Sequence, residues 1–206
     1  MKRKGILGGT FDPIHCGHMI AARAAMEQYG LDEVLLMTGG NPPHKSGIEV
    51  TPAWMRHEMV KLAAAGEEGM VPFDYEVGKT EPTYTVLTMT ELKARHPDTE
   101  FYFIIGEDSL RDLIKWYKPE EIAKLCVILV YPRGRATALE ELVRERQREL
   151  NADIRIIDAP VIEIASTDLR ERIAAGKSVR YFVPDAVLDY IKEKRLYEKK
   201  GDAGQA

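Results

Sequence analysis

The pattern of apolar residues restricts the fold of this chain more than any other feature of its sequence. Short runs are apolar almost throughout, and they lie at residues 5–9, 34–38, 100–105, 125–131 and 154–158. A strand with one face in water would alternate apolar and polar side chains, whereas these runs are nearly continuous. They therefore predict parallel strands that helices cover on both faces.

The segments between these runs predict the covering helices, at residues 18–29, 51–65, 85–95 and 137–150, with two more that begin near residues 166 and 184. Thr51-Pro52 is typical of a helix start, with threonine as the N-cap and proline at the first helical position. The 137–150 segment has only a thin apolar stripe, which predicts a solvent-facing cover helix. Strands and helices that alternate with right-handed crossovers give an α/β fold: a doubly wound parallel sheet with a helical C-terminal part.

The 206 residues suit one domain, which we expect to span residues 1–197 and to leave a frayed polar tail at 198–206. No apolar stretch approaches the roughly 18 residues of a transmembrane helix, so we expect no membrane association. Cys16 and Cys126 are too few for a disulfide framework and favour the reducing cytoplasm. The sequence does not fix the oligomeric state, and a homo-oligomer stays open beside a monomer.

The charge balance excludes one class of function. Lysine and arginine number 29, aspartate and glutamate 33, and the formal net charge is −4. A general nucleic-acid-binding protein is usually basic, so we expect no nucleic acid polymer as a partner. The acidic residues lie largely on predicted cover helices, such as those around Glu140 and Glu193. A site for an anionic ligand must therefore depend on local positive charge.

In a doubly wound sheet, ligands bind beyond the carboxyl ends of the strands. The segments expected there are residues 8–13, 39–45, 106–108, 133–135 and 165–170. The dinucleotide fingerprint G-x-G-x-x-G does not follow the first strand. Gly78-Lys79-Thr80 and Gly176-Lys177-Ser178 resemble the end of a Walker A loop, but both lack its upstream glycine and are interpreted as surface turns.

One loop does have the features of a phosphate site, and it reads GGTFDPIHCGH over residues 8–18. Its first two glycines let backbone N–H groups approach an anion closely. The start of the first helix adds unpaired N–H donors and partial positive charge. His15 and His18 are three residues apart, so they would lie on one side of this helix start and donate hydrogen bonds to a polyphosphate.

Without further information, several of the candidate site residues can also be interpreted in another way. The two histidines could form a metal pair, although no third and fourth ligands cluster nearby, or they could be incidental loop residues. Ser166, with Asp168 and Glu171 after it, could be an ordinary helix cap. Lys45 could be a solvated loop residue, and Trp116 could belong to the core.

Two signatures in this chain resemble a known superfamily. The 8–18 loop resembles the (H/T)-x-G-H signature of the nucleotidylyltransferases in its adenylyltransferase form. Residues 164–170 (IASTDLR) are similar to the second signature, I-S-S-T-x-x-R, with Ala165 in place of the first serine. Intermediate segments narrow the resemblance to the bacterial nicotinate mononucleotide adenylyltransferases, and it extends to about Tyr197. These segments are Pro42-Pro43-His44-Lys45, Arg56-x-x-Met59, Pro82-Thr83-Tyr84-Thr85, Ile105-Gly106-Glu107-Asp108, Trp116-Tyr117 and Val183-Pro184.

This resemblance implies a Rossmann-like nucleotidylyltransferase fold and one reaction. The phosphate of nicotinate mononucleotide would attack the α-phosphorus of ATP directly, without a covalent enzyme intermediate. The products would be pyrophosphate and nicotinate adenine dinucleotide, a precursor of NAD. Catalysis of this kind depends on positioning and on charge stabilisation. Mg²⁺ would arrive with ATP and be held mainly by phosphates and water, with no metal site built by the protein.

The resemblance also implies which residues form the site. Those expected to bind ATP are Gly8, Gly9, Thr10, Phe11, His15, His18, Gly106, Asp108, Ser166, Thr167 and Arg170. Those expected to bind nicotinate mononucleotide are His44, Lys45, Thr85, Trp116, Tyr117 and Arg133. The expected catalytic residues are His18, His15, Lys45 and Arg170. His18 would donate to the α-phosphate, and Arg170 would neutralise the leaving pyrophosphate. Trp116 would stack on the pyridine ring, and Thr85 would bind its carboxylate.

Two other functions stay open at this point. A related enzyme could transfer an adenylyl or cytidylyl group to a different phosphate. A catalytically idle nucleotide-binding module could also have the same fold, because fold alone does not fix function.

Overall fold

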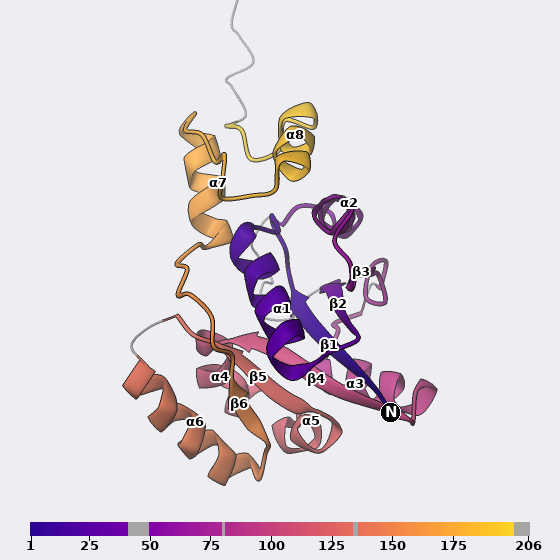
Figure 1. The fold of residues 1–206 in the computed structure, drawn as a ribbon. Helices are drawn as coiled ribbons and strands as arrows, with labels where there is room; N and C mark the ends of the chain where they lie inside the picture. The colour runs from indigo at the N-terminus through magenta and orange to yellow at the C-terminus, as the bar shows by residue number, and fades with distance from the viewer. Residues whose placement is uncertain (41–49, 80, 134–135, 200–206) are drawn as a thin grey trace, which may run out of the picture.

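The computed structural model describes residues 1–40, 50–79, 81–133 and 136–199. These residues form a six-stranded sheet in the order β3-β2-β1-β4-β5-β6, and all its paired strands are parallel (Figure 1). The strands are β1 (Lys2–Gly9), β2 (Glu33–Thr38), β3 (Met70–Phe73), β4 (Thr99–Gly106), β5 (Val127–Tyr131) and β6 (Ile154–Ile156). The chain builds outward from β1 in one direction and from β4 in the other, which is the arrangement of a doubly wound sheet.

Helices cover both faces of the sheet. One face packs against α1 (Cys16–Tyr29) and α2 (Ala53–Ala64), and α7 (Ser166–Ala174) and α8 (Asp185–Glu193) contribute to the same core from beyond the sheet (Figure 1). The other packs against α3 (Thr85–Arg95), α4 (Glu107–Asp112), the 3-10 helix η2 (Leu113–Lys115), α5 (Pro119–Leu125) and α6 (Ala136–Leu150). None of the described helices is long and apolar enough to cross a membrane.

Adjacent residues of the central strands are buried on opposite faces. In β1, Ile6 belongs to the core beneath α3 and α6, while Leu7 belongs to the core beneath α1 and α2. Leu35 and Leu36 of β2 divide in the same way. Because successive side chains of a strand point to opposite faces, a sheet covered on both faces needs continuous apolar runs. The structure thus confirms the predicted α/β architecture.

The structure adds elements that the sequence pattern did not predict. Strand β3 has only four residues, contains Pro72, and among the described strands pairs with β2 alone. A short edge strand with a proline has no recognisable alternation, although an edge tolerates the missing N–H. Between β4 and β5 lie α4, η2 and α5, with six, three and seven residues. Such short helices leave little periodicity to detect.

Two predicted helix starts were wrong, each by a small shift. Helix α1 begins at Cys16 rather than at residue 18, so His15 is its N-cap. Helix α2 has Pro52 as its N-cap in place of Thr51. The N–H of Thr51 instead donates to the carboxylate of Asp12, and its carbonyl accepts from Arg56. The thin stripe of α6 is confirmed, since the four residues predicted to form it are all buried: Leu139, Leu142, Val143 and Leu150.

We predict that Leu36→Ala lowers the free energy of unfolding by about 2–5 kcal/mol, because it leaves a cavity at a fully buried position of β2. Urea titration followed by circular dichroism measures the change. Leu87→Ala is the matched control, because that side chain is 58% exposed. It should stay within roughly 0.5 kcal/mol of the parent protein. Equal losses in the two variants would contradict the assigned core.

Candidate active site

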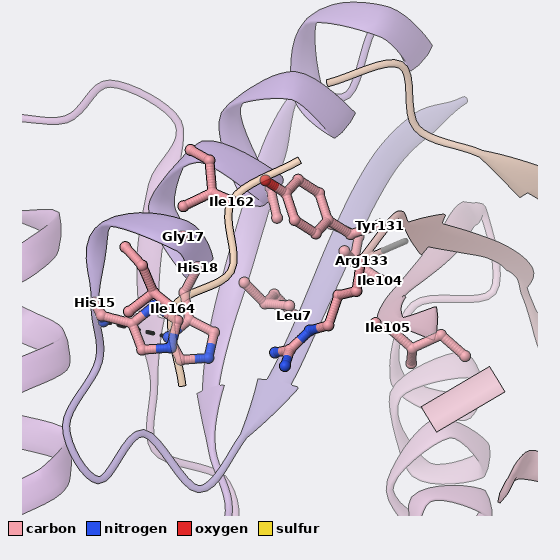
Figure 2. A pocket seen from close by; sticks show the side chains of 12 residues that line it. Leu7, His15, Gly17, His18, Ile104, Ile105, Tyr131, Arg133, Ile162 and Ile164 are labelled. Atoms are coloured by element: carbon pink, nitrogen blue, oxygen red, sulfur yellow. Dashed lines mark hydrogen bonds between the residues drawn. The ribbon is translucent and has the colours of Figure 1, made fainter. Parts of the chain in front are cut away.

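A pocket opens at the carboxyl edge of the sheet, where β1 and β4 lie side by side (Figure 2). The chain leaves these two strands in opposite directions, which is where doubly wound sheets bind ligands. The start of α1 and the ends of β1, β4 and β5 supply most of the lining. The lining residues are Leu7, His15, Gly17, His18, Ala21, Ile104, Ile105, Gly106, Tyr131, Arg133, Ile162 and Ile164.

The two imidazoles of the predicted phosphate loop stack on each other at the start of α1. Their ring centroids are 3.6 Å apart and their planes differ by 22°. The backbone N–H of His15 donates to Nδ1 of His18 at 3.2 Å. Since Nδ1 accepts this bond, the proton of a neutral His18 ring is on Nε2. His18 therefore has an N–H donor on the ring atom opposite to this backbone contact.

Both histidines are held in the neutral form. Burial lowers the pKa of His15 to about 4, and the nearby Arg133 cation contributes in the same direction. Burial also lowers the pKa of His18 well below its ordinary value, with further contributions from His15 and Arg133. At neutral pH the two rings are therefore uncharged hydrogen-bonding groups. Hydrogen bonds from neutral rings to an anion need no formal positive charge, which fits the acidic composition of the chain.

Phe11 supports this arrangement from within the core. Its side chain is only 2% exposed, and its ring meets that of His18 edge to face with centroids 5.0 Å apart. The backbone of Phe11 is left-handed, with φ 52°. A Cβ added at Gly9 would lie 2.8 Å from the Phe11 ring, so Gly9 leaves the space that the ring occupies. Phe11 thus fixes the position of His18.

Arg133 provides the cation of the pocket. It follows β5 and extends into the space that His15 and His18 also line (Figure 2). Its Nη1 atom lies 3.5 Å from the carboxylate of Asp108. Because the Asp108 side chain is largely exposed, this ion pair is weak. Its backbone N–H donates to the buried carboxylate of Glu107 at 3.2 Å. Arg133 therefore lines the same pocket as the residues expected to bind ATP, beside Gly106.

Residues of the second signature lie against the first loop. Ser166 donates its hydroxyl to the carbonyl of Pro13 at 2.9 Å. Arg170 donates from Nη1 to the carbonyl of Asp12 at 2.8 Å and from Nη2 to the hydroxyl of Thr167 at 3.3 Å. The N-cap of α7 is Ala165, with no side-chain capping bond, so the alternative of an ordinary cap at Ser166 was wrong.

The structure also assigns roles to residues that the sequence analysis left without one. Arg56 of α2 is buried and donates to four backbone carbonyls, those of Thr10, Gly39, Gly40 and Thr51. The one available signal was its spacing, because Arg56 shares a helical stripe with the buried residues Met59, Val60 and Ala63. A charged residue on the core-facing side of a helix needs partners in the interior.

Asp12 is a second buried polar centre. It is 3% exposed, and its carboxylate accepts from the hydroxyl of Tyr197 at 2.6 Å and from the N–H of Thr51 at 3.3 Å. Burial, followed by the charge of Asp12, raises the pKa of the Tyr197 hydroxyl, which therefore stays protonated and donates. This contact joins the end of the described chain to the first loop.

Arg133 was expected to bind nicotinate mononucleotide but lines the pocket with His15 and His18, whereas the other described residues of that set lie elsewhere. Trp116 is half-buried and its ring meets that of Phe103 at a centroid distance of 6.2 Å. Tyr117 is 48% exposed and lies 5.0 Å from the Tyr84 ring. Thr85 is the first residue of α3. These side chains do not line the pocket of Figure 2. His44 and Lys45 fall outside the described residues.

The described residues offer no ready site for a metal ion. Over these parts of the chain, no group of three or more histidine, cysteine, aspartate or glutamate side chains could hold one. The hydrogen bond at Nδ1 of His18 further disfavours the metal pair as an interpretation of the two histidines.

Comparisons with known proteins agree with this geometry. Residues 6–172 match the cytidylyltransferase-like family. A probable nicotinate-nucleotide adenylyltransferase from Synechococcus sp. (strain JA-3-3Ab) is 45% identical over 95% of each chain. One from Clostridium kluyveri is 38% identical over 96% of this chain and all of its own. The solved nicotinic acid mononucleotide adenylyltransferase of Plasmodium falciparum, complexed with NaAD, has a TM-score of 0.77 at 20% identity, covering 96% of this chain and 98% of its own. The chain therefore belongs to the nicotinate-nucleotide adenylyltransferase family of cytidylyltransferase-like proteins.

Proposed function

We propose that this chain transfers the adenylyl group of ATP to nicotinate mononucleotide, giving nicotinate adenine dinucleotide and pyrophosphate. The oxygen of the mononucleotide phosphate forms a bond to the α-phosphorus of ATP, and the bond from that phosphorus to the β-phosphate oxygen breaks. The observation that carries the proposal is the stacked His15–His18 pair at the start of α1, in the pocket between β1 and β4. The names of close relatives support the choice of acceptor.

His18 acts on the α-phosphate in this proposal. Its Nε2–H is fixed by the backbone bond at Nδ1, so it donates without first having to take up a proton. A donor fixed in this way stabilises the negative charge that redistributes as the bond to pyrophosphate breaks. His15 binds the phosphates beside it and keeps the His18 ring in place by stacking.

Arg170 and the start of α7 act on the leaving group. Arg170 holds the carbonyl of Asp12 through one nitrogen, and its guanidinium has further donors for the β- or γ-phosphate. Ser166 and Thr167 contribute at the N-terminus of α7, where the helix dipole favours an anion. Gly8, Gly9 and Thr10 let the ligand approach the end of β1, and Asp108 accepts from ribose hydroxyls. Arg133 adds positive charge next to His18.

The acceptor site is proposed beside the end of β4. Thr85, at the start of α3, binds the nicotinate carboxylate through its N–H and hydroxyl, and Trp116 stacks on the pyridine ring. Tyr117 extends this surface, with His44 and Lys45 contributing to phosphate binding by the resemblance alone. Recognition of the carboxylate favours the acid over its amide analogue.

Mg²⁺ enters as part of the ATP complex in this proposal. Asp108 is an exposed carboxylate 3.5 Å from Arg133, which lines the pocket. One carboxylate does not make a cage for a hard cation, which suits an ion held by phosphates and water. We further propose that residues 1–197 work as one domain in the cytoplasm, because Tyr197 contacts the first loop and both cysteines are free thiols.

Pyrophosphate release from ATP tests the function when the acceptor is varied. Nicotinate mononucleotide should support the fastest release, its amide analogue slower release, and phosphopantetheine none. Turnover with phosphopantetheine alone would favour a related transferase, and no turnover with any acceptor would favour a nucleotide-binding module.

We predict that His18→Ala lowers kcat by about 10²–10³-fold, because it removes one donor to the transition state. The Kd for ATP should change much less. His96→Ala is the matched control, since this histidine is exposed and does not line the pocket. Steady-state pyrophosphate release gives kcat, and a near-wild-type kcat in His18→Ala would remove His18 from the proposed chemistry.

Trp116→Ala should raise KM for nicotinate mononucleotide by roughly 5- to 150-fold, the equivalent of about 1–3 kcal/mol of stacking. KM for ATP should change little. Trp54→Ala is the control for loss of a tryptophan, because Trp54 is 61% exposed on α2. Equal rises in both KM values with a lowered Tm would instead assign Trp116 to core packing on Phe103.

The buried histidines predict a pH dependence of stability. Their folded pKa values lie below 6.5, so between pH 7 and pH 5 the unfolded chain binds protons that the folded chain does not. The free energy of unfolding should therefore decrease as the pH is lowered from 7 to 5. His15 alone should account for about 2 kcal/mol of this decrease. Urea unfolding at pH 7, 6 and 5 measures this. His15→Gln should flatten the slope, and an unchanged slope would contradict a neutral, buried His15.

A further inference from the structure

Arg56 is a buried cation that touches neither solvent nor a carboxylate partner among the described residues. Its side chain is 2% exposed, and no carboxylate of the described chain lies within ion-pair distance of it. Instead, its nitrogens donate to backbone carbonyls, with distances of 2.8 Å to Thr51, 2.8 Å to Gly39 and 3.1 Å to Gly40. A further bond from Nη1 reaches the carbonyl of Thr10.

These carbonyls come from three segments that meet at the carboxyl edge of the sheet. Thr10 follows β1, Gly39 and Gly40 follow β2, and Thr51 precedes α2. The guanidinium thus joins the ends of two neighbouring strands to the helix that packs on them. Gly39 also donates its N–H to the carbonyl of Gly9 at 2.8 Å, so the two strand ends are fixed directly to each other as well.

The direction of each peptide group follows from these bonds. In a trans peptide the carbonyl and the N–H of the next residue point in opposite directions. Because the Thr10 carbonyl points at Arg56, the N–H of Phe11 points away from Arg56. The N–H of Gly40, opposite the Gly39 carbonyl, donates to the carboxylate of Glu76 at 3.4 Å. The same carboxylate accepts from the hydroxyl of Thr88 at 2.8 Å. The Gly39–Gly40 peptide is therefore held from both sides.

We propose that Arg56 is a positioning residue for adenylyl transfer: it holds the Thr10 carbonyl inward, so that the N–H of Phe11 faces the phosphates, and it fixes the loop after β1 to the end of β2 through the Gly39 and Gly40 carbonyls. This inference rests on the proposed function. Carbonyl oxygens left at the strand ends would repel a polyphosphate, whereas oxygens bound to a buried cation do not face it. The nearby Asp12 carboxylate offsets part of the Arg56 charge, so the effect on a phosphate comes from the direction in which the peptide groups are held.

A merely structural role explains the arrangement less well. An apolar side chain of similar volume would fill the same space without the cost of burying a charge. The guanidinium instead presents several donors in a rigid plane, which lets one side chain hold carbonyls from three segments. Lysine has a single ammonium group on a flexible stem and cannot hold four separate oxygens in fixed directions.

Two substitutions at Arg56 and one elsewhere test the proposal. Arg56→Lys keeps the positive charge but loses the planar set of N–H donors. Arg56→Met keeps a similar volume but loses both the charge and the donors. Arg146→Lys is the matched control, because Arg146 is also a buried arginine, 6% exposed, on α6 with Glu149 and the carbonyl of Arg111 as partners. Each variant is measured for kcat, for KM of both substrates, for ATP affinity by calorimetry without acceptor, and for Tm.

We expect both Arg56 variants to lower kcat/KM for ATP by about tenfold or more and to weaken ATP binding. Both should also lower Tm, because carbonyls that accept from Arg56 lose their donor. Arg146→Lys should lower Tm yet leave kcat/KM within about twofold. Parental ATP affinity in Arg56→Met would overturn the proposal, as would equal losses of kcat/KM in Arg146→Lys and Arg56→Lys at equal Tm. No turnover by the parent protein with nicotinate mononucleotide would count against the proposed function instead, because ATP affinity still tests Arg56.

Discussion

The loop between β1 and α1 leaves the sheet without a regular hydrogen-bonding partner, and side chains from distant segments hold it in place. Arg56 of α2 binds the carbonyl of Thr10, Arg170 of α7 binds that of Asp12, and Tyr197 binds the Asp12 carboxylate. Every one of these contacts joins residues at least 46 positions apart in the chain. The position of the His15–His18 pair therefore depends on the folding of the whole unit, which is consistent with helices α2, α7 and α8 sharing one core with α1.

The sequence predicted the sheet because the constraint is repeated in each strand: both faces are buried, so each run is apolar. It missed β3 because an edge strand of four residues with Pro72 has no such constraint. The histidines and Arg170 were found through their motifs, and the structure brings both motifs against one loop. The tautomer of His18 could not be predicted, because it depends on a backbone bond that forms only when His15 becomes the N-cap. Arg56 was visible as a charge on an apolar stripe, but its partners follow only from the fold.

The mildly acidic composition and an anionic ligand are compatible for a physical reason. The groups proposed to bind anions around the pocket are largely uncharged: backbone N–H groups at the start of α1 and two imidazoles kept neutral by burial. The described cations near the site are few and lie on different elements: Arg133 lines the pocket, Arg170 of α7 binds the carbonyl of Asp12 in the loop, and Arg56 of α2 binds the carbonyl of Thr10. Such a site concentrates positive potential in one place while the remaining surface stays acidic. The net charge of −4 therefore excludes a general polyanion binder without arguing against a nucleotide site.

The end of β4 links the two proposed ligand sites. Gly106 closes the strand and lines the pocket with His18, and the chain then continues through α4 and η2 to reach Trp116 ten residues later. Trp116 returns to the same strand, since its ring packs on Phe103. One buried strand thus positions a residue of the proposed ATP pocket and the support of the proposed pyridine platform. Because in-line transfer requires the attacking oxygen and the α-phosphorus to be held at a fixed separation, a common rigid strand is a better base for both ligands than two independently moving loops.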